Sequence, residues 1–276
     1  MNKRKRTLTQ RLVSAPYIVW AAIFIVVPLL MVFYYAFTDA ETGSFTFSNI
    51  TAISGFADTF VISIWLGAVA TVICLLISYP LAYFITKLSS RTQKFMLILI
   101  MLPMWINLLL RTYALMKILE DTGLINHLFN LLGLPSVHMI NTRGAVIAGM
   151  VYNFIPYMVL PIYTVMSRID RPLIEASNDL GAGAFATFRR VIMPMSLPGV
   201  ISGITMVFVP SVSTFYISRK LGGTLTLIGD SIEYKFINEN DYNVGAAMSL
   251  VLMVMIILCM LVMNRFSDGE EEAIVV

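Results

Sequence analysis

The amino-acid sequence predicts an all-α membrane protein with six transmembrane helices. Of its 276 residues, 58% are hydrophobic and 13% are charged, and the mean hydropathy is +0.82. A soluble domain is usually nearer half apolar and a quarter charged. A helix needs about 20 mostly apolar residues to cross a bilayer. Six segments meet this condition, and together they predict one transmembrane domain over residues 16–264: 16–37, 59–86, 95–118, 144–166, 196–217 and 244–264.

The first segment, residues 16–37, is interpreted as an uncleaved transmembrane helix. The basic run Lys3-Arg4-Lys5-Arg6 precedes it and would also suit a secretory signal peptide. The apolar core of a signal peptide is about 7–15 residues long. This segment has 22 residues, and no Ala-x-Ala-like cleavage site follows it. We therefore expect an N-terminal tail over residues 1–15 and then the first span.

The second segment has no charged residue, whereas the third, residues 95–118, carries Arg111 and Lys117 in its second half. Asn107 and Arg111 are four residues apart and would share one face of a helix. Trp105 lies just past Pro103, which can kink a helix. An Arg at mid-depth costs roughly 2.5–3.5 kcal/mol on insertion scales, so Arg111 should face protein or water rather than lipid. We favour a structural role, in which Arg111 pairs with an external acid or with backbone carbonyls, over a gating role.

The remaining segments follow in order. Residues Gly123–Gly133 predict a short amphipathic helix before the fourth span. The fifth span contains Gly199 and Gly203, a spacing that allows two helices to approach closely, either within the chain or between subunits. The sixth span is followed by an acidic tail over residues 265–276, for which we expect a solvated, mobile end.

The distribution of basic residues predicts that both termini face the cytoplasm, because cytoplasmic loops carry an excess of Lys and Arg. Thirteen basic residues fall on the side of the termini and four on the other side. The thirteen are Lys3, Arg4, Lys5, Arg6, Arg11, Lys87, Arg91, Lys94, Arg168, Arg171, Arg189, Arg190 and Arg265. The external loops are acidic by contrast, which is consistent either with plain solvation or with attraction of a cationic ligand.

The longest polar stretch between two spans, residues 168–197, predicts a short helix with its own start and stop signals. Asp170 can cap the helix, and Pro172 suits its first turn. Glu175 lies near the N-terminal end, where an anion is favoured, and Gly181 falls where a glycine ends a helix. About ten helical residues are too few to be stable alone in water. The helix must therefore pack on its own membrane domain or on a partner.

This stretch resembles the cytoplasmic motif of the membrane subunits of bacterial ABC importers. That motif is Glu-Ala-Ala, three residues, Gly, nine residues, then Ile-x-Leu-Pro. The chain has Glu175-Ala176-Ser177, Gly181 and Val191-Ile192-Met193-Pro194 at the same spacing. It departs conservatively from the motif at Ser177, Val191 and Met193.

The likeness extends over nearly the whole chain and is greatest to the B-type permeases of spermidine/putrescine importers. It includes residues 102–113, 157–163, 173–183 and 215–218, with Gly222-Gly223. It implies the type I ABC importer permease fold, a second C-type permease, two copies of an ATPase subunit and an extracytoplasmic polyamine-binding protein. It also implies a helix that couples the permease to the ATPase, with the candidate residues Glu175, Ala176, Ser177, Asp179, Gly181 and Pro194.

The chain contains no Gly-x-x-x-x-Gly-Lys phosphate loop. We therefore expect it to bind no cofactor and to perform no catalysis, with ATP and Mg²⁺ held by the partner ATPase. Its cysteines and histidines show no metal-ligand spacing, so no metal site is expected. Its surroundings would be the lipid bilayer of the bacterial inner membrane, without a nucleic-acid partner.

A polyamine is recognised by aromatic faces and by carboxylates. Half or more of the aromatic residues at suitable depth would be ordinary packing or interfacial residues. The candidates for the substrate pathway are Trp105 and Tyr152 first, then Asn107, Tyr113, Tyr157, Phe215 and Tyr216, with Asp39, Asp230 and Glu233 near the external mouth.

Three alternatives are open on the sequence alone. The first is an ABC importer permease for another solute, such as an anion, a metal or an amino acid, and the acidic external loops disfavour the anion. The second is a secondary transporter, but no inverted repeat and no acid buried within a span is evident. The third is a membrane-embedded enzyme, for which no catalytic cluster is present.

Overall fold

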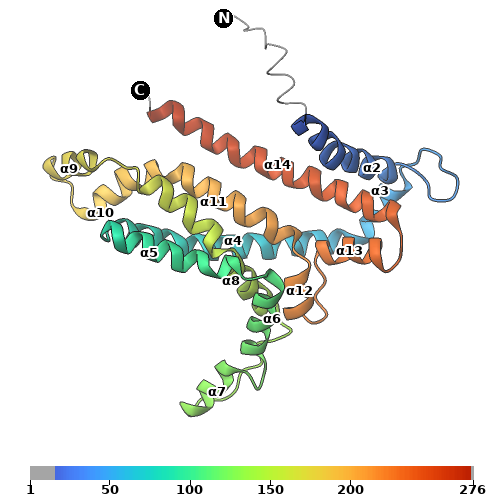
Figure 1. Cartoon of the computed structure of the whole chain (residues 1–276), viewed down its shortest axis with the longest axis horizontal. Helices are drawn as coiled ribbons and strands as arrows, with labels where there is room; N and C mark the ends of the chain where they lie inside the picture. The colour runs from blue at the N-terminus through green and yellow to red at the C-terminus, as the bar shows by residue number, and fades with distance from the viewer. Residues whose placement is uncertain (1–15, 275–276) are drawn as a thin grey trace, which may run out of the picture. The chain divides into compact units, whose positions relative to one another are not determined.

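The computed structural model describes residues 16–274 and is almost entirely helical (Figure 1). Within these residues the β pairing is limited to one isolated bridge between Thr38 and Phe45. The contacts divide the chain into two compact units. One comprises the chain up to Phe56 with Ile232–Met255, and the other comprises Ala57–Ser231 with the chain from Ile256 onwards. The predicted N-terminal tail, residues 1–15, lies outside the described residues.

The first unit begins with an apolar helix over Pro16–Ala36, which is long enough to cross a membrane. It contains a π-helical turn, η1 (Ala22–Val26), and continues as α2 (Val27–Ala36). After a loop come α3 (Ser48–Ala52) and η2 (Ile53–Phe56). The unit also includes the beginning of α14 (Tyr242–Ile274) and the end of α13 (Ile228–Ile237).

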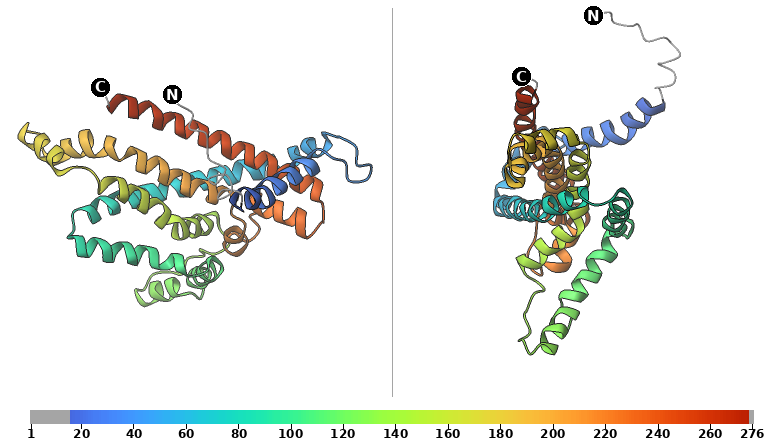
Figure 2. Two further views of the ribbon diagram at one scale, coloured as in Figure 1. Left: turned by 45° about the horizontal axis from the view of Figure 1, so that its top comes forward. Right: turned by 90° about the vertical axis from the view of Figure 1, so that its left-hand side faces the viewer.

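The second unit has a core of three long helices that pack side by side: α4 (Ala57–Thr86), α8 (Arg143–Met166) and α11 (Met193–Ser213) (Figures 1 and 2). Their shared interior is apolar, as expected for helices that bury one face. Among its fully buried residues are Leu66, Ala70, Val146, Met158, Ile162 and Val207.

The two glycines of the fifth segment serve this packing. A Cβ on Gly199 would lie 2.8 Å from the carbonyl oxygen of Pro161, and one on Gly203 would lie 2.7 Å from the sulfur of Met158. Both neighbours belong to α8. The close approach allowed by this spacing is therefore used inside the chain, between α11 and α8, which decides one question that the sequence left open.

The third segment is not the single helix that the sequence predicted. It consists of α5 (Ser90–Met101), the 3₁₀ turn η3 (Leu102–Trp105) and α6 (Leu108–Leu119), with α7 (Leu124–Leu131) following. The parts Ser90–Trp105 and Leu108–Leu131 meet at 94°. Ile106 is extended, Asn107 has a non-helical backbone, and the Asn107 side chain accepts a hydrogen bond from the Leu109 N–H at 2.8 Å. Asn107 thus starts a new helix. The apolar segment 95–118 is interrupted here, although its composition suits a single span.

Within residues 16–274, five helices are long and apolar enough to cross a membrane, and the bent pair would make a sixth span. The predicted helix Gly123–Gly133 is confirmed as α7. Two further boundaries differ from the prediction. The fifth span begins at Ala184 and ends at Ser213, where Thr214 is extended and the short α12 (Tyr216–Leu221) follows. The acidic tail is helical as far as Ile274, because α14 continues into it instead of stopping at 264.

Candidate functional site

The polar segment between the fourth and fifth spans forms the short helix α9 (Arg171–Asp179), and its end shows why glycine occupies position 181. Gly181 has φ +82°, the left-handed conformation that other residues rarely adopt. The Gly181 N–H donates to the Asn178 carbonyl at 2.9 Å, and the Ala182 N–H donates to the Ser177 carbonyl at 3.1 Å. These two bonds form the Schellman motif, which satisfies the last carbonyls of a helix. The stop signal predicted from the sequence is therefore present.

Helix α9 starts at the predicted position, but the predicted capping hydrogen bond is not formed. Asp170 occupies the N-cap position, yet its side chain makes no capping hydrogen bond. Pro172 lies in the first turn as expected. The structure therefore defines the beginning of this helix less strongly than its end.

Two hydroxyl contacts hold α9 to the next element, α10 (Ala184–Thr187). The Ser177 and Thr187 hydroxyls are 3.1 Å apart, and the Thr187 hydroxyl donates to Asn178 Oδ1 at 3.2 Å. Thr187 is buried in this contact. By contrast Leu180 is 90% exposed, and Leu173 and Phe185 are also exposed. A short segment that is held by these contacts and exposes apolar residues has the character of a protein contact.

The segment then joins α11 through a π-helical turn, η4 (Phe188–Ile192). The Met193 N–H bonds back to the Phe188 carbonyl. A wider turn of this kind accommodates Pro194, which lacks an N–H and would crowd a regular α-helix. Residues Ala184–Ser213 are therefore one continuous helical rod, and Pro194 lies inside it rather than at its entrance.

Aromatic rings connect this rod to α4. The Phe188 ring lies 5.9 Å from the Tyr79 ring and 5.2 Å from the Tyr83 ring, both edge-on. The Tyr79 hydroxyl is 2.9 Å from the Ser196 hydroxyl. Edge-to-face pairs of this kind contribute beyond simple burial, about 0.5–1.5 kcal/mol each. If α10 and η4 moved, these contacts would transmit the movement to α4, which is a core helix of the membrane domain.

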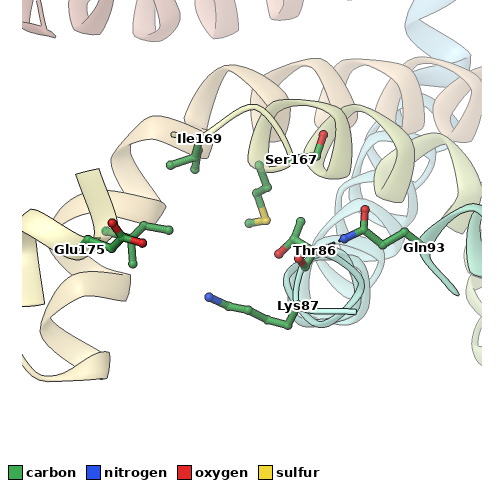
Figure 3. Close-up of a pocket in the computed structure, with 8 residues that line it drawn as sticks. Thr86, Lys87, Gln93, Ser167, Ile169 and Glu175 are labelled. Atoms are coloured by element: carbon green, nitrogen blue, oxygen red, sulfur yellow. Dashed lines mark hydrogen bonds between the residues drawn. The ribbon is translucent and has the colours of Figure 1, made fainter. Parts of the chain in front are cut away.

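A recess of about 380 Å³ lies beside α9 and is shown in Figure 3. Its lining residues are Thr86, Lys87, Gln93, Met166, Ser167, Ile169, Ile174 and Glu175. Lys87 extends from the end of α4 toward the helix that carries Glu175, across open space (Figure 3). The Lys87 ammonium lies 5.0 Å from the centre of the Tyr83 ring. The recess thus has a cation on one wall and an anion on the other.

The wall of the recess opposite α9 is stiffened by Gln93. Its side-chain N–H groups donate to the carbonyls of Thr86 at 3.2 Å and Leu88 at 2.9 Å. Its side-chain oxygen accepts a hydrogen bond from the Tyr163 hydroxyl at 2.9 Å. Residues from α4, α5 and α8 are therefore locked together behind α9. Neither Gln93 nor Lys87 could be assigned to a site from the sequence, because their neighbours come from distant parts of the chain.

The aromatic candidates for the substrate pathway lie in different surroundings. Trp105 is 76% exposed and lies at the break before α6. Lys117 lies over the Tyr113 ring and Lys220 over the Tyr216 ring, each 5.8 Å from the ring centre. The rings of Tyr113 and Tyr216 are therefore each already in contact with a lysine of this chain. Of the remaining candidates, Asn107, Tyr152 and Phe215 are exposed and Tyr157 is half-buried.

Two short elements bring several of these candidates into one region. Helices α6 and α12 contact one another, and both contact α8. Asn107, Tyr113 and Trp105 lie on or next to α6, whereas Phe215 and Tyr216 begin α12. Tyr152 and Tyr157 lie on α8. The helices that follow these two breaks, α6 after Asn107 and α12 after Ser213, are therefore in contact with each other and with α8.

Arg111 lies in the same region, on α6, and is 7% exposed. The expected ion pair with an external acid is not found: among residues 16–274 its Nε and Nη1 atoms have no hydrogen-bond partner. The adjacent Thr112 is fully buried and lies 3.5 Å from the side-chain nitrogen of Asn153 on α8. The Asn153 side chain also donates to the Gly149 carbonyl at 2.9 Å. A polar cluster at Arg111, Thr112 and Asn153 is therefore buried in an apolar unit.

The acidic candidates have mainly structural surroundings. Asp230 is buried, and its Oδ2 accepts hydrogen bonds from the Ser218 hydroxyl at 2.5 Å and the Leu227 N–H at 2.9 Å. The carboxylate thereby joins α12 to the start of α13. Asp39 Oδ1 accepts from the Thr42 N–H at 2.9 Å and the Glu41 N–H at 3.1 Å. The place of Asp230 near the external mouth of the pathway stays a prediction, and in this structure its buried carboxylate positions α12 against α13. Glu233 is half-buried.

We predict that Asp230→Ala lowers the thermal stability of the purified protein. The Ser218 hydroxyl and the Leu227 N–H would lose their buried acceptor, at a cost of about 1–3 kcal/mol each. The matched control is Asp121→Ala, because Asp121 pairs with His138 on the exposed surface at 2.8 Å. Fluorescence-monitored melting should show a clear fall for the first variant and a much smaller one for the second. Equal melting temperatures would contradict the positioning role.

No group of three or more His, Cys, Asp or Glu side chains that could hold a metal is present in the described part of the chain.

Comparison with known proteins adds evidence on the family. Residues 75–269 match the family described as "Binding-protein-dependent transport system inner membrane component". The chain is 35% identical over 258 residues to the "Spermidine/putrescine transport system permease protein PotB" of Escherichia coli K12, covering 90% of this chain and 94% of that protein. It is 34% identical over 266 residues to the protein of the same name from Haemophilus influenzae, covering 93% of each.

A solved structure gives the same fold. A chain of a bacterial alginate ABC transporter, determined in complex with an alginate pentasaccharide-bound periplasmic protein, superimposes with a TM-score of 0.73. The match covers 93% of both chains at 17% sequence identity. At that identity the likeness concerns the fold alone.

Proposed function

Because the chain belongs to the family of binding-protein-dependent transport system inner membrane components, we propose that it is the permease subunit of an ATP-driven importer of polyamines. The chain is a multi-pass protein of the inner membrane, and a protein of this family works with a binding protein. In the proposed complex it forms half of the translocation pathway, and a second, C-type permease forms the other half. Two copies of an ATPase subunit bind and hydrolyse ATP with Mg²⁺.

The observation that carries the coupling part of this proposal is the construction of α9. Its end is set by Gly181, its inner side is tied to α10 by Ser177 and Thr187, and its outer surface exposes Leu180. In the proposed orientation, with both termini in the cytoplasm, this surface faces the ATPase. Movement of the docked ATPase would pass through α10 and η4 to Tyr79 and Tyr83 on α4.

The polyamine class rests on the names of the relatives at 35% and 34% identity over most of the chain. The acidic residues of the proposed external loops favour a cationic substrate. The defining experiment reconstitutes this chain with its genetic neighbours in proteoliposomes and measures uptake of labelled spermidine. Uptake that requires both ATP and the binding protein is expected. Uptake driven by a proton gradient without ATP would contradict the proposal.

We predict that Trp105→Ala reduces the apparent affinity for spermidine in this assay. An exposed indole face can attract an ammonium group, at about 0.5–2 kcal/mol, so the concentration for half-maximal uptake should rise roughly two- to thirtyfold. Trp65→Ala is the matched control, because Trp65 is also exposed but lies on α4, outside the candidate region. Unchanged kinetics for Trp105→Ala, or an equal change for Trp65→Ala, would remove Trp105 from the pathway.

A further inference from the structure

A loop in the first unit, residues 37–47, presents aromatic rings to the surroundings instead of burying them. Phe45 is 70% exposed and Phe47 is 59% exposed. With Phe37 they form a three-ring cluster whose ring centres are 5.1–5.8 Å apart. Phe37, Phe45 and Phe47 are the phenylalanine cluster. A contiguous apolar patch with polar residues around it, here the hydroxyls of Thr42, Ser44, Thr46 and Ser48, is typical of an interaction site.

The loop that carries the cluster is rigid. The Asp39 N–H donates to the Ser44 carbonyl at 2.9 Å, and the Thr46 N–H donates to the Phe37 carbonyl at 2.9 Å. Asp39 closes the turn by accepting hydrogen bonds from the N–H and the hydroxyl of Thr42, both at 2.9 Å. These bonds and that from the Glu41 N–H, with the backbone of Thr42 as the largest contributor, lower the pKa of Asp39, so it is ionised at neutral pH.

The base of the loop is clamped by two asparagines. The Asn49 side chain donates to the carbonyls of Thr38 at 2.9 Å and Ala36 at 3.3 Å. The Asn243 side chain donates to the carbonyls of Thr38 and Tyr35. These bonds satisfy carbonyls at the end of α2 that lack helical partners. A loop held at both its base and its tip loses little freedom on binding, which is what a preorganised recognition surface requires.

The charge around the cluster distinguishes between two kinds of partner. In the stretch of the first unit from residue 16 to Phe56, the charged residues are Asp39 and Glu41, and Lys and Arg do not occur. Segments that bind lipid surfaces are rich in Lys and Arg on their polar side, which attract anionic headgroups. The acidic surroundings therefore disfavour the bilayer surface. They suit a protein that offers an apolar pocket with basic residues at its edge.

We infer that the phenylalanine cluster is a docking surface for the extracytoplasmic binding protein, with Phe45 and Phe47 as anchors and Glu41 as part of the charged rim. This inference rests on the proposed function, which places the loop outside the cytoplasm. Exposed aromatic anchors carry much of the binding free energy in protein interfaces. The rim charges act mainly on the rate of encounter and on its salt dependence.

The first test uses the reconstituted complex and measures ATP hydrolysis against the concentration of binding protein. With Phe45→Ser and Phe47→Ser combined, the concentration for half-maximal stimulation should rise roughly tenfold or more. The matched variant Phe45→Tyr with Phe47→Tyr keeps both rings and should stay near the original value. Glu41→Lys should weaken stimulation at low salt, with the difference reduced at high salt. An unchanged half-maximal concentration for the serine variant would overturn the inference.

The second test distinguishes a protein partner from lipid. Phe45→Cys is made in a Cys259→Ser background, in which the remaining Cys74 is buried. A membrane-impermeant maleimide should label the introduced thiol in the complex, and added binding protein should protect it. Absence of labelling before the binding protein is added would indicate burial in lipid, and labelling without protection would indicate a free loop. Either result overturns the inference.

Failure of the docking surface and failure of the proposed function give different results. If the binding protein does not stimulate ATP hydrolysis even in the unmodified complex, the proposed function fails. If it does stimulate hydrolysis, but the serine variant behaves like the unmodified chain, only the docking surface is wrong.

Discussion

A Gly181→Asp substitution is expected to stop ATP-driven uptake while the subunit still inserts into the membrane. Gly181 has φ +82°, and no atom lies near the position of an added Cβ, so the penalty comes from the backbone and not from a clash. A left-handed conformation costs a non-glycine residue about 1–2 kcal/mol. To avoid it the chain would give up the hydrogen bond from Ala182 to Ser177 and shift the end of α9. Ser177 also contacts Thr187, so the docking helix would lose its alignment with α10.

Gly183 provides a matched control for this substitution. It lies two residues away, has φ −71° and occupies the N-cap position of α10. Aspartate is favoured at such a position, so Gly183→Asp adds the same charge in the same segment without backbone strain. Gly181→Asn should behave like Gly181→Asp, because both residues tolerate the left-handed region to a similar extent, so any difference between the two variants would come from the charge. Proteoliposome uptake, ATP hydrolysis and co-purification of the ATPase should be measured together.

The expected pattern for Gly181→Asp is normal membrane insertion with loss of uptake, and ATP hydrolysis that no longer responds to the binding protein. Glu175→Lys should show the same pattern, because it replaces the anion beside the Lys87 wall of the recess with a second cation. Full uptake by Gly181→Asp would contradict the coupling role. So would equal inactivation by Gly183→Asp, since the effect would then come from charge and not from the end of the helix.

The sequence was most informative where a local signal had a single physical meaning. Gly181 was expected to end a helix, and it forms a Schellman motif. The apolar segments were expected to be membrane spans because their composition alone decides that property. The break at Asn107 was missed for the same reason: an apolar run shows its length but not its continuity. In hindsight Asn107, which precedes Leu108–Leu110, had the pattern of an N-cap residue.

The site was less predictable because its contacts join distant residues. The recess brings together Lys87, Gln93 and Glu175, and no spacing along the chain indicates that neighbourhood. The sequence likewise does not show that Ser218 and Leu227 donate hydrogen bonds to the Asp230 carboxylate. The link from Phe188 to Tyr79 and Tyr83 likewise depends on how α4 and α11 pack. Such contacts are properties of the fold rather than of local patterns.

Arg111→Met is expected to separate stability from transport. Arg111 is 7% exposed, and its Nε and Nη1 have no partner among the described residues, so the native protein carries an uncompensated cost there. Replacing buried ionic groups by apolar ones of similar size is often neutral or stabilising, by about 1–4 kcal/mol. Methionine fills irregular space well. The melting temperature of the variant should therefore stay the same or rise.

Transport by the same variant should fall. A buried charge that destabilises the fold is typically found at a functional position, so removing the Arg111 charge should impair transport. Arg111→Lys keeps the charge but loses the planar fork, so it shows which of the two properties matters. Arg111→Met with lower stability and normal uptake would make Arg111 a structural residue with a partner not yet located. If Arg111→Met raised the melting temperature and left uptake normal, the Arg111 charge would have no role in transport. A stable variant that binds the ATPase but does not transport would place Arg111 at the moving part of the pathway, next to the break at Asn107.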